Sequence, residues 1–197
     1  MTSAATPKGL RRRSRLIEAA GALLLEGGFD AVRHRAVAER AQLPLASTTY
    51  YFGSLEDLMA EAAANVCRHD EECIAERRDA LPKRRRGGQA TADALAEVFI
   101  GPDTTIQTLA ARYETIALAA RYPRLRDVVV DRRKLLAEMH SDVLQKSYRV
   151  ADPVHVGHLI AVEDGAVVGA LGMRHGNPYV AARDALHEVI DVLAPRE

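Results

Sequence analysis

RHRAVAERAQLPLASTTYYF, residues 33–52, decides the fold of this chain. Val37, Ala38 and Ala41 place apolar side chains on one face of a helix, and the turn that follows ends at Pro44. Pro44 suits the first turn of a second short helix, because its missing N–H would have no partner there in any case. Two short helices joined by a tight turn form a helix-turn-helix pattern.

The second helix of this pattern is rich in hydroxyl groups. They belong to Ser47, Thr48, Thr49, Tyr50 and Tyr51. Hydroxyl groups and aromatic tips on a short exposed helix bind the phosphate oxygens of nucleic acids well. Residues 33–52 therefore indicate a surface that contacts a nucleic acid.

Charge is distributed unevenly along the chain. The 197 residues hold 27 basic and 27 acidic side chains, so the formal net charge is zero. Residues 1–53 hold eight Lys and Arg against four Asp and Glu, a net charge of +4, which leaves −4 for the remainder. Because blocks of basic residues bind polyanions electrostatically, only the N-terminal end is expected to meet a nucleic acid. The alternative is that these charges are merely solvated.

Composition predicts a globular, cytoplasmic protein. Hydrophobic residues make up 48% of the chain and charged residues 27%, which is enough to bury a proper core. No run of about 18 apolar residues and no apolar signal segment is present. Cys67 and Cys73 lie six residues apart in one expected helix, where roughly 9 Å between their Cα atoms precludes a disulfide within that helix. They are interpreted as ordinary thiols, with a redox sensor as the alternative.

The rest of the chain also has helical periodicity, and no alternating strand pattern competes with it. Helices are expected at about residues 9–27, then as two short helices within residues 33–52, and then at about residues 54–81, 92–100, 104–121, 124–148, 153–174 and 179–193. Ser54 and Asp57 form a capping box that starts the fourth, and Asp152 caps the eighth. The predicted fold is all-α with about nine helices. A helix-turn-helix head, residues 1–53, joins a larger helical body, residues 54–197, through the helix of residues 54–81.

The expected helix of residues 153–174 has small residues at a spacing of four. Glycine costs about 1 kcal/mol relative to alanine in a helix interior, so this stripe implies that something packs very closely against it. Either another helix of the fold lies there, or, as we favour, this helix and the last one meet their symmetry mates in a twofold dimer. The expected dimer-interface residues are Gly157, Ala161, Gly165, Val168, Gly169, Leu186 and Ile190.

The order of the N-terminal motifs resembles the TetR family of bacterial transcriptional regulators. The resemblance covers about the first 60 residues, with the motifs EGGFDA at 26–31, VAERA at 37–41, YYFGS at 50–54 and LEDL at 55–58. The remaining residues match by length and all-helical layout only. The resemblance implies a homodimeric repressor on a palindromic DNA operator, with a ligand-binding and dimerisation body that releases the DNA when a small amphipathic effector binds. Activation in place of repression stays open.

The resemblance also implies roles for individual positions. Bases would be read by Arg35, Leu45, Ala46 and Ser47, and phosphates held by Thr49, Tyr50 and Tyr51. Arg35 is an independent choice as well, because a guanidinium can bind guanine O6 and N7 with two hydrogen bonds. An effector pocket is expected between the helices of residues 104–121, 124–148 and 153–174. The expected lining residues are Tyr113, Arg121, Met139 and His140. They place aromatic, thioether or polar groups on otherwise aliphatic helix faces, as the lining of a pocket for an amphipathic molecule would.

Three positions depart from the family pattern. Gln42 replaces the usual turn glycine, so it must adopt a positive φ or the turn must differ. Arg33 replaces the threonine that commonly caps the first helix of the motif, so that cap must come from elsewhere. Leu55 replaces a lysine at the start of the linking helix, which removes one expected phosphate contact.

Other functions are open alternatives. The chain could be a helical small-molecule carrier or interaction protein without a DNA function. His155 and His158 share a helical face, and with Asp152 or Glu163 as a third ligand they would suit a metal-responsive regulator. No enzyme is expected, because there is no Gly-rich phosphate loop, nucleophile elbow or defensible Cys-His or Ser-His pair. No cofactor or bound metal is predicted. The basic run of residues 82–88 reads as a solvated loop, with a second nucleic-acid contact as the alternative.

Overall fold

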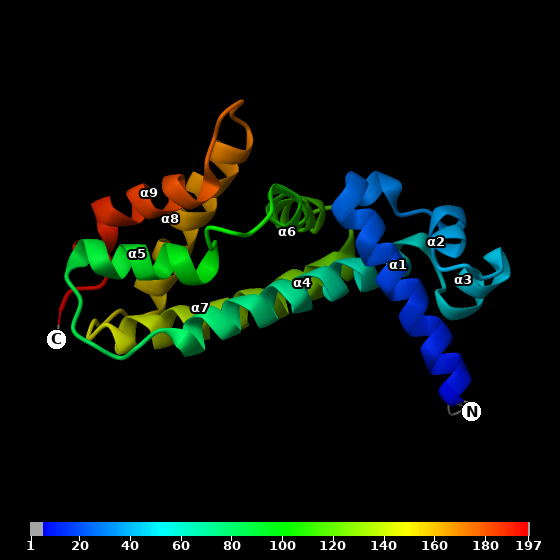
Figure 1. Cartoon of the computed structure of the whole chain (residues 1–197), viewed down its shortest axis with the longest axis horizontal. Coiled ribbons are helices and arrows are strands. Elements are labelled where there is room, and N and C mark those ends of the chain that lie inside the picture. Colours follow the sequence, from blue (N-terminus) through cyan, green and yellow to red (C-terminus); the bar gives the residue numbers. More distant parts are fainter. Residues whose placement is uncertain (1–5, 197) are drawn as a thin grey trace. The chain divides into compact units, whose positions relative to one another are not determined.

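The computed structural model describes residues 6–196, and over this range the chain is built from helices without a strand (Figure 1). The described helices are α1 (Pro7–Ala31), α2 (His34–Arg40), α3 (Leu45–Tyr51), α4 (Leu55–Ala80), α5 (Gly88–Phe99), α6 (Ile106–Leu118), α7 (Pro123–Lys146), α8 (Pro153–Leu171) and α9 (Pro178–Leu193). The predicted all-α fold is confirmed. Residues 1–5 of the predicted head lie outside the described residues.

The chain packs into two compact units. The first holds the residues up to His69 together with Gln107–Val130, and the second holds Asp70–Ile106 together with the residues from Asp131 onward. Helices α4 and α7 therefore contribute to both units. This division by packing does not test the predicted functional division after residue 53, which stays a prediction.

The first unit buries the apolar stripe that was expected on its first helix. Leu16, Ala20 and Leu24 of α1 are buried in one cluster with Val37 of α2 and Phe52 after α3. Helix α2 contacts both α1 and α3, which lie beside it in Figure 1. The helix-turn-helix is thus held by a shared core, and the outer side of α3 is left free.

Several helix ends follow the predicted local chemistry. The Ser54 hydroxyl accepts a hydrogen bond from the Asp57 amide (3.0 Å), as a capping residue does. The Asp152 carboxylate accepts one from the His155 amide (2.8 Å), which lowers the pKa of that carboxyl. Pro44 corrects the expectation for α3: it is the residue before the helix and not part of its first turn.

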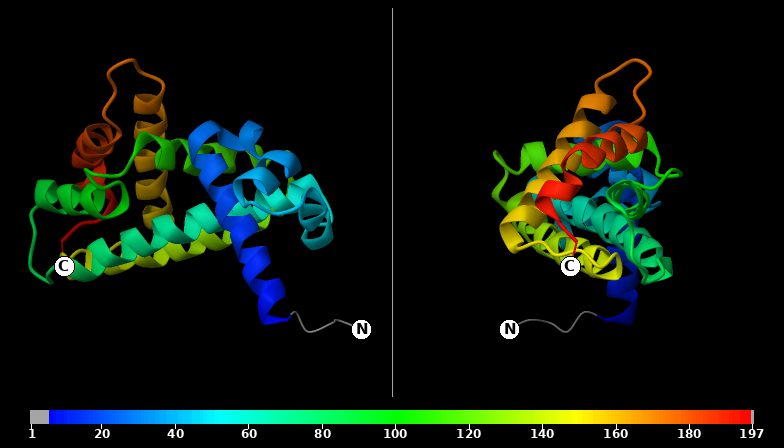
Figure 2. Two further views of the ribbon diagram at one scale, coloured as in Figure 1. Left: turned by 45° about the vertical axis from the view of Figure 1, so that its right-hand side comes forward. Right: turned by 90° about the vertical axis from the view of Figure 1, so that its left-hand side faces the viewer.

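The second unit has its own core, in which α9 packs against both α5 and α8. The two views of Figure 2 show α5 (green) and α9 (red) side by side, with the turn between α8 and α9 (orange) extending away from them. The fully buried side chains of this core include Ile74, Leu95, Leu144, Leu159 and Ile190.

A buried ion pair joins α4 to α7 within the second unit. The Arg132 guanidinium donates to the carboxylates of Asp70 (2.5 Å) and Glu71 (2.9 Å). Arg132 and Asp70 are almost entirely buried. Removing one partner of such a pair would leave an uncompensated charge in the core, which is strongly destabilising.

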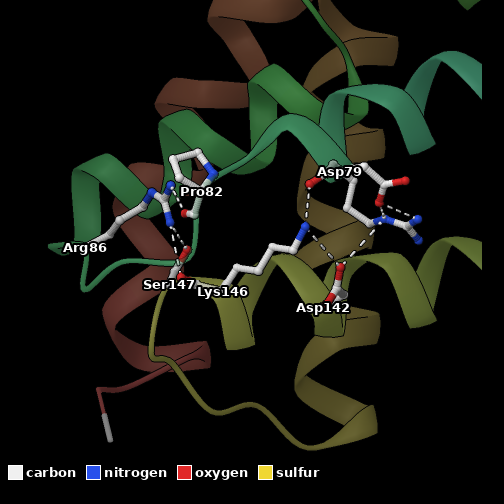
Figure 3. A network of polar contacts seen from close by, with 7 residues as sticks. Asp79, Pro82, Arg86, Asp142, Lys146 and Ser147 are labelled. Carbon is white, nitrogen blue, oxygen red and sulfur yellow. Dashed lines mark hydrogen bonds and ion pairs between the residues drawn. The ribbon is translucent and has the colours of Figure 1, made fainter.

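The basic loop of residues 82–88 is only partly the solvated loop that was expected (Figure 3). Lys83, Arg84 and Arg85 are exposed, but Arg86 is buried. Its guanidinium donates to the carbonyl oxygens of Pro82 (2.8 Å), Arg84 (3.4 Å) and Lys146 (3.3 Å), and to the Ser147 hydroxyl (3.3 Å). Burial and the neighbouring positive charge of Arg84 lower the pKa of Arg86. Arg86 thus ties the loop to the end of α7.

The same close-up shows a second tie between α4 and α7 (Figure 3). The Lys146 ammonium donates to the Arg78 carbonyl oxygen (2.7 Å) and lies 3.7 Å from the Asp142 carboxylate. Arg78 in turn lies within ion-pair distance of both Asp79 (2.7 Å) and Asp142 (3.6 Å). The two helix ends are therefore joined by a network of charges and carbonyl groups.

Helix α8 is the one described helix whose length and composition would let it cross a membrane. The buried core helix of a water-soluble protein meets the same criterion, so one such helix does not indicate a membrane-spanning segment. Glu163 and Asp164 lie in its middle, where a membrane-spanning segment rarely carries charge.

Candidate nucleic-acid interface

Helix α3 separates its side chains into an inner and an outer set. Thr48 is fully buried, and its hydroxyl donates to the Leu45 carbonyl oxygen (2.8 Å). Leu45 and Tyr50 point outward, with exposed fractions of 52% and 80%. Ala46 and Thr49 are exposed too, whereas Ser47 and Tyr51 are half-buried. Six of the seven residues expected at the nucleic acid therefore lie on this helix with their side chains at least partly accessible.

Arg35, the seventh, is on α2. Its side chain is 84% exposed and pairs with Glu39 one turn along the same helix (3.0 Å). An ion pair between two exposed side chains contributes little to stability, so the guanidinium is free to exchange Glu39 for another partner. Arg35 is thus accessible, as base reading would require.

The three departures from the family pattern have local explanations. Gln42 adopts the positive φ, 52°, that the usual turn glycine would take. No side chain caps the start of α2, where Arg33 stands; the Arg33 guanidinium instead binds the carbonyl oxygens of Phe29 (3.3 Å) and Val32 (3.2 Å). Leu55 is half-buried against the core of the first unit.

A groove runs between α3 and the beginning of α1. Its volume is about 770 Å³, and it is lined by Thr6, Lys8, Gly9, Arg12, Pro44, Ala46, Ser47, Tyr50 and Tyr51. The groove brings four of the expected residues together with Lys8 and Arg12, which had not been chosen as site residues. The crowding of basic residues at the start of this helix was the signal for them, because positive charge opposes the dipole at a helix N-terminus.

The basic residues of the N-terminal end fall into two groups. Five guanidinium groups are bound within the chain: Arg13 to Glu61, Arg15 to the Ala41 carbonyl oxygen, Arg33 to Asp30, Arg35 to Glu39 and Arg40 to Glu26. Within residues 6–196 the other three, Lys8, Arg11 and Arg12, have no carboxylate partner. The uncompensated positive charge is therefore concentrated in the first turns of α1, at the groove.

The ion pair between Arg40 and Glu26 illustrates how an arginine bound within the chain joins two helices. Two hydrogen bonds, of 2.8 and 2.6 Å, join the Arg40 guanidinium to the Glu26 carboxylate and lower the pKa of Glu26. This fork ties the end of α2 to α1. Arg15 and Arg40 thus hold the helix-turn-helix together, whereas the second group and the exposed Arg35 are available to an external anion.

The four residues expected at an effector lie in different units. Tyr113 (half-buried) and Arg121 (exposed) belong to the first unit, whereas Met139 and His140 are buried in the second. His140 stacks on Phe99, with 3.4 Å between ring centroids. The structure does not test their role as effector contacts.

His140 also forms a buried polar pair with Glu163. Its Nδ1 lies 2.7 Å from the Leu136 carbonyl oxygen, which only accepts, so Nδ1 carries a proton. Nε2 lies 3.4 Å from Glu163 Oε2, and a hydrogen bond there requires one proton between the two groups. The second unit thus buries a polar pair beside an aromatic ring, in addition to its ion pair between Arg132 and Asp70.

The expected dimer residues divide between surface and core. Gly157, Gly165 and Gly169 of α8 are exposed, and a Cβ atom added to any of them would meet nothing within 4 Å. Close packing by another helix of the same chain therefore does not explain this stripe, and Ala161 and Val168 are exposed with it. Leu186 and Ile190 need correction: both are fully buried in the chain's own core, so they cannot offer a surface to a partner copy.

The alternatives of metal and redox sensing find no support in the described residues. His155 and His158 lie close, with 6.1 Å between ring centroids, but no group of three or more metal-binding side chains is found within residues 6–196. Cys67 is buried and Cys73 half-buried, and neither forms a disulfide within the described residues.

Two family descriptions match the sequence and together span most of it. Residues 16–62 match the family described as bacterial regulatory proteins, tetR family. Residues 86–192, more than half of the chain, match the family described as tetracyclin repressor-like, C-terminal domain. A search of curated protein sequences finds no match.

Solved structures resemble more than nine-tenths of the chain. The multidrug binding protein EbrR complexed with proflavin is 27% identical, with a TM-score of 0.71, and the match covers 91% of this chain and 99% of that one. A TetR-family member from Streptomyces coelicolor A3 is 28% identical, with a TM-score of 0.68 and coverage of 92% and 99%. A regulator from Mesorhizobium loti MAFF303099 has a TM-score of 0.71 at 16% identity, with coverage of 94% and 97%, and so shares the fold.

Proposed function

This chain belongs to the TetR family of bacterial regulatory proteins, and from this premise we propose that it is a sequence-specific transcriptional repressor. It binds a palindromic DNA operator as a homodimer and leaves it when a small molecule binds the body. The observation that carries the proposal is the groove beside α3, where an exposed recognition helix faces a helix start with uncompensated positive charge.

The geometry supports a division of labour on the DNA. Leu45, Ala46 and Ser47 stand at the start of α3, the end of a recognition helix that reaches base edges in the major groove. Arg35 offers a guanidinium suited to guanine. The hydroxyls of Thr49, Tyr50 and Tyr51 suit phosphate oxygens, which position the protein without reading sequence.

Dimerisation is supported by the open face of α8. Gly157, Ala161, Gly165, Val168 and Gly169 form an exposed surface that no described residue covers. A second copy placed there by a twofold axis would bury it, and the two heads would then reach half-sites about one DNA turn apart. Such a protein acts where the DNA is, so we propose a cytoplasmic location.

The effector is proposed to be an amphipathic aromatic molecule, and the first class to test is the aromatic cation. Structures of EbrR, 27–29% identical to this chain, contain proflavin, ethidium or malachite green, which are cations of this class. In this chain Met139 and His140 of the second unit remain proposed contacts, and Tyr113 and Arg121 remain separate candidates in the first unit. Effector binding releases DNA only if the effector prefers a state of the dimer that fits the operator poorly.

A gel-retardation experiment tests the proposal. The purified protein is mixed at low salt with duplex DNA from upstream of its own gene and with a random duplex of the same length. We expect the upstream duplex to be retarded at lower protein concentration, and added malachite green to reverse this. A protein that retards neither duplex is not a DNA-binding repressor, and the carrier function would then take its place.

A further inference from the structure

The Phe29 peptide is held on both sides by side chains from other elements. Its N–H donates to Glu114 Oε1 of α6 (3.2 Å), 85 residues further along the chain. Its carbonyl oxygen accepts hydrogen bonds from the Arg33 guanidinium (3.3 Å) and from the Val32 amide (3.2 Å). The Phe29 side chain is buried in the core of the first unit. The backbone between α1 and α2 is therefore fixed at this residue.

Gly28 makes room for the Glu114 carboxylate. Its backbone has φ 66° and ψ −169°, a conformation that is essentially restricted to glycine. A Cβ atom added at Gly28 would lie 2.8 Å from Glu114 Oε2 and 3.2 Å from Oε1. The carboxylate thus rests against bare backbone, and the kink at the end of α1 is shaped around it.

Glu114 is half-buried, and within residues 6–196 no basic side chain forms an ion pair with its carboxylate. Its hydrogen-bond partner is the Phe29 amide. Attraction to a positive charge therefore does not explain the position of the Glu114 carboxylate. A charge-assisted hydrogen bond from a backbone amide to a carboxylate holds that amide in position. The role of Glu114 is therefore geometric.

We propose that Glu114 is a positioning residue for the recognition helix, an inference that rests on the proposed DNA-binding function. The links run from Glu114 to the Phe29 amide, from the Phe29 carbonyl to Arg33, and from Arg33, where α2 begins, through the packing of α2 on α3. Loss of the carboxylate frees the Phe29 amide and loosens the start of α2. Base reading depends on the placement of α3, whereas phosphate attraction depends mainly on charge. The operator affinity should therefore fall and the affinity for random DNA should not.

The test compares Glu114→Gln, whose amide oxygen can still accept the hydrogen bond, with Glu114→Leu, which cannot. Gln107→Ala, at an exposed position of the same helix, is the matched control. Fluorescence anisotropy measures the affinity for an upstream duplex that the unmodified protein retards and for a random duplex. For Glu114→Leu we expect the affinity ratio between the two duplexes to fall about 3- to 10-fold, as for one lost hydrogen bond. The affinity ratios of Glu114→Gln and Gln107→Ala should stay within about twofold of that of the unmodified protein, which corresponds to a negligible difference in binding free energy.

A second measurement separates positioning from general destabilisation. Hydrogen exchange of the Phe29 amide, followed by NMR, should be faster in Glu114→Leu than in Glu114→Gln at unchanged melting temperature. Should Glu114→Leu melt early, Glu114→Ala with the same two readouts replaces it. If Glu114→Leu leaves the affinity ratio unchanged, or lowers the affinity for both duplexes equally, this inference is wrong, but the proposed function stands. Failure of the unmodified protein to bind any duplex overturns the proposed function, and this inference with it.

Discussion

The Arg15 guanidinium donates a hydrogen bond to the Ala41 carbonyl oxygen at 2.6 Å, so the first helix braces the end of the second. Ala41 closes α2 and is followed by Gln42 with its positive φ. An arginine from the basic start of α1 therefore stabilises the turn of the helix-turn-helix. Arg12, three residues earlier on α1, instead lines the groove and has no carboxylate partner within residues 6–196.

This contrast predicts different phenotypes for two similar changes. Arg12→Ala should lower the slope of log affinity against log salt by about 0.9, the effect of one lost phosphate contact, without changing stability. Arg15→Ala should lower the free energy of unfolding by about 1 kcal/mol, because the Ala41 carbonyl loses a charged donor. Salt titration of DNA binding and urea unfolding measure the two effects. The assignment fails if the two variants exchange these behaviours.

Arg35→Ala tests base reading. Because a guanidinium that binds guanine discriminates by about 1 to 3 kcal/mol, the variant should lose that amount for one operator base pair and become indifferent to its identity. Competition among duplexes substituted at each position reveals this. Arg40→Ala is the control, since Arg40 is engaged with Glu26 and should affect all duplexes alike. Unchanged affinity and base preference would remove Arg35 from the reading set.

Tyr51→Phe tests phosphate positioning. Removal of the hydroxyl should weaken binding to every duplex by a similar factor, on the order of 1 kcal/mol, because phosphates carry no sequence information. The same set of substituted duplexes serves as the assay. A loss confined to one base position would show that Tyr51 reads sequence.

Gly165→Arg tests the dimer face. Apart from its own stretch of helix backbone, no described atom lies within 4 Å of the place where its Cβ would be, so the protomer itself accommodates the side chain. A long charged side chain in a flat contact between two copies would keep them apart. Sedimentation should show a monomer where the unmodified protein is a dimer, and operator binding should weaken. Gln89→Arg, on the exposed side of α5, should leave both unchanged. A Gly165→Arg variant that stays dimeric places the interface elsewhere.

The cap of α8 predicts a pH dependence. The hydrogen bond from the His155 amide lowers the pKa of Asp152 below its ordinary value of 3.8. Because the carboxylate is favoured in the folded state, its contribution is present above that ordinary value and is lost as the pH falls through the lowered pKa. Asp152→Asn keeps a capping oxygen but cannot titrate. The melting temperatures of the two proteins, compared between pH 6 and pH 2, should therefore fall more steeply for the unmodified one. Parallel curves would contradict this.

Local sequence patterns predicted much of the fold and part of the candidate nucleic-acid interface. Ser54 and Asp152 cap their helices as their sequence context predicted, because a cap depends on residues three positions apart. The α3 residues expected at the nucleic acid lie on one short helix with their side chains at least partly accessible, and Thr48, which was not among them, is the one that is buried. These features follow from periodicity and need no knowledge of distant contacts.

Other features depend on residues far apart in sequence. Leu186 and Ile190 have the same apolar pattern whether they face a core or a partner, and only the packing of α9 against α5 and α8 shows that they face the core. Arg86 looked like one more residue of a solvated loop. Its guanidinium is instead buried, and it donates to the carbonyl oxygens of Pro82 and Lys146, two residues far apart in the sequence. Burial of a charge is a tertiary property.

The sequence by itself determined the all-α class, the helix-turn-helix and the basic end, because short-range periodicity, capping and charge are written in neighbouring residues. The tertiary structure alone decided which arginines brace the helix-turn-helix and which stay available to an anion. It also decided that Gly28 faces the Glu114 carboxylate. The physical reason is the same in each case: a hydrogen bond or a buried surface needs a partner, and that partner was supplied by folding.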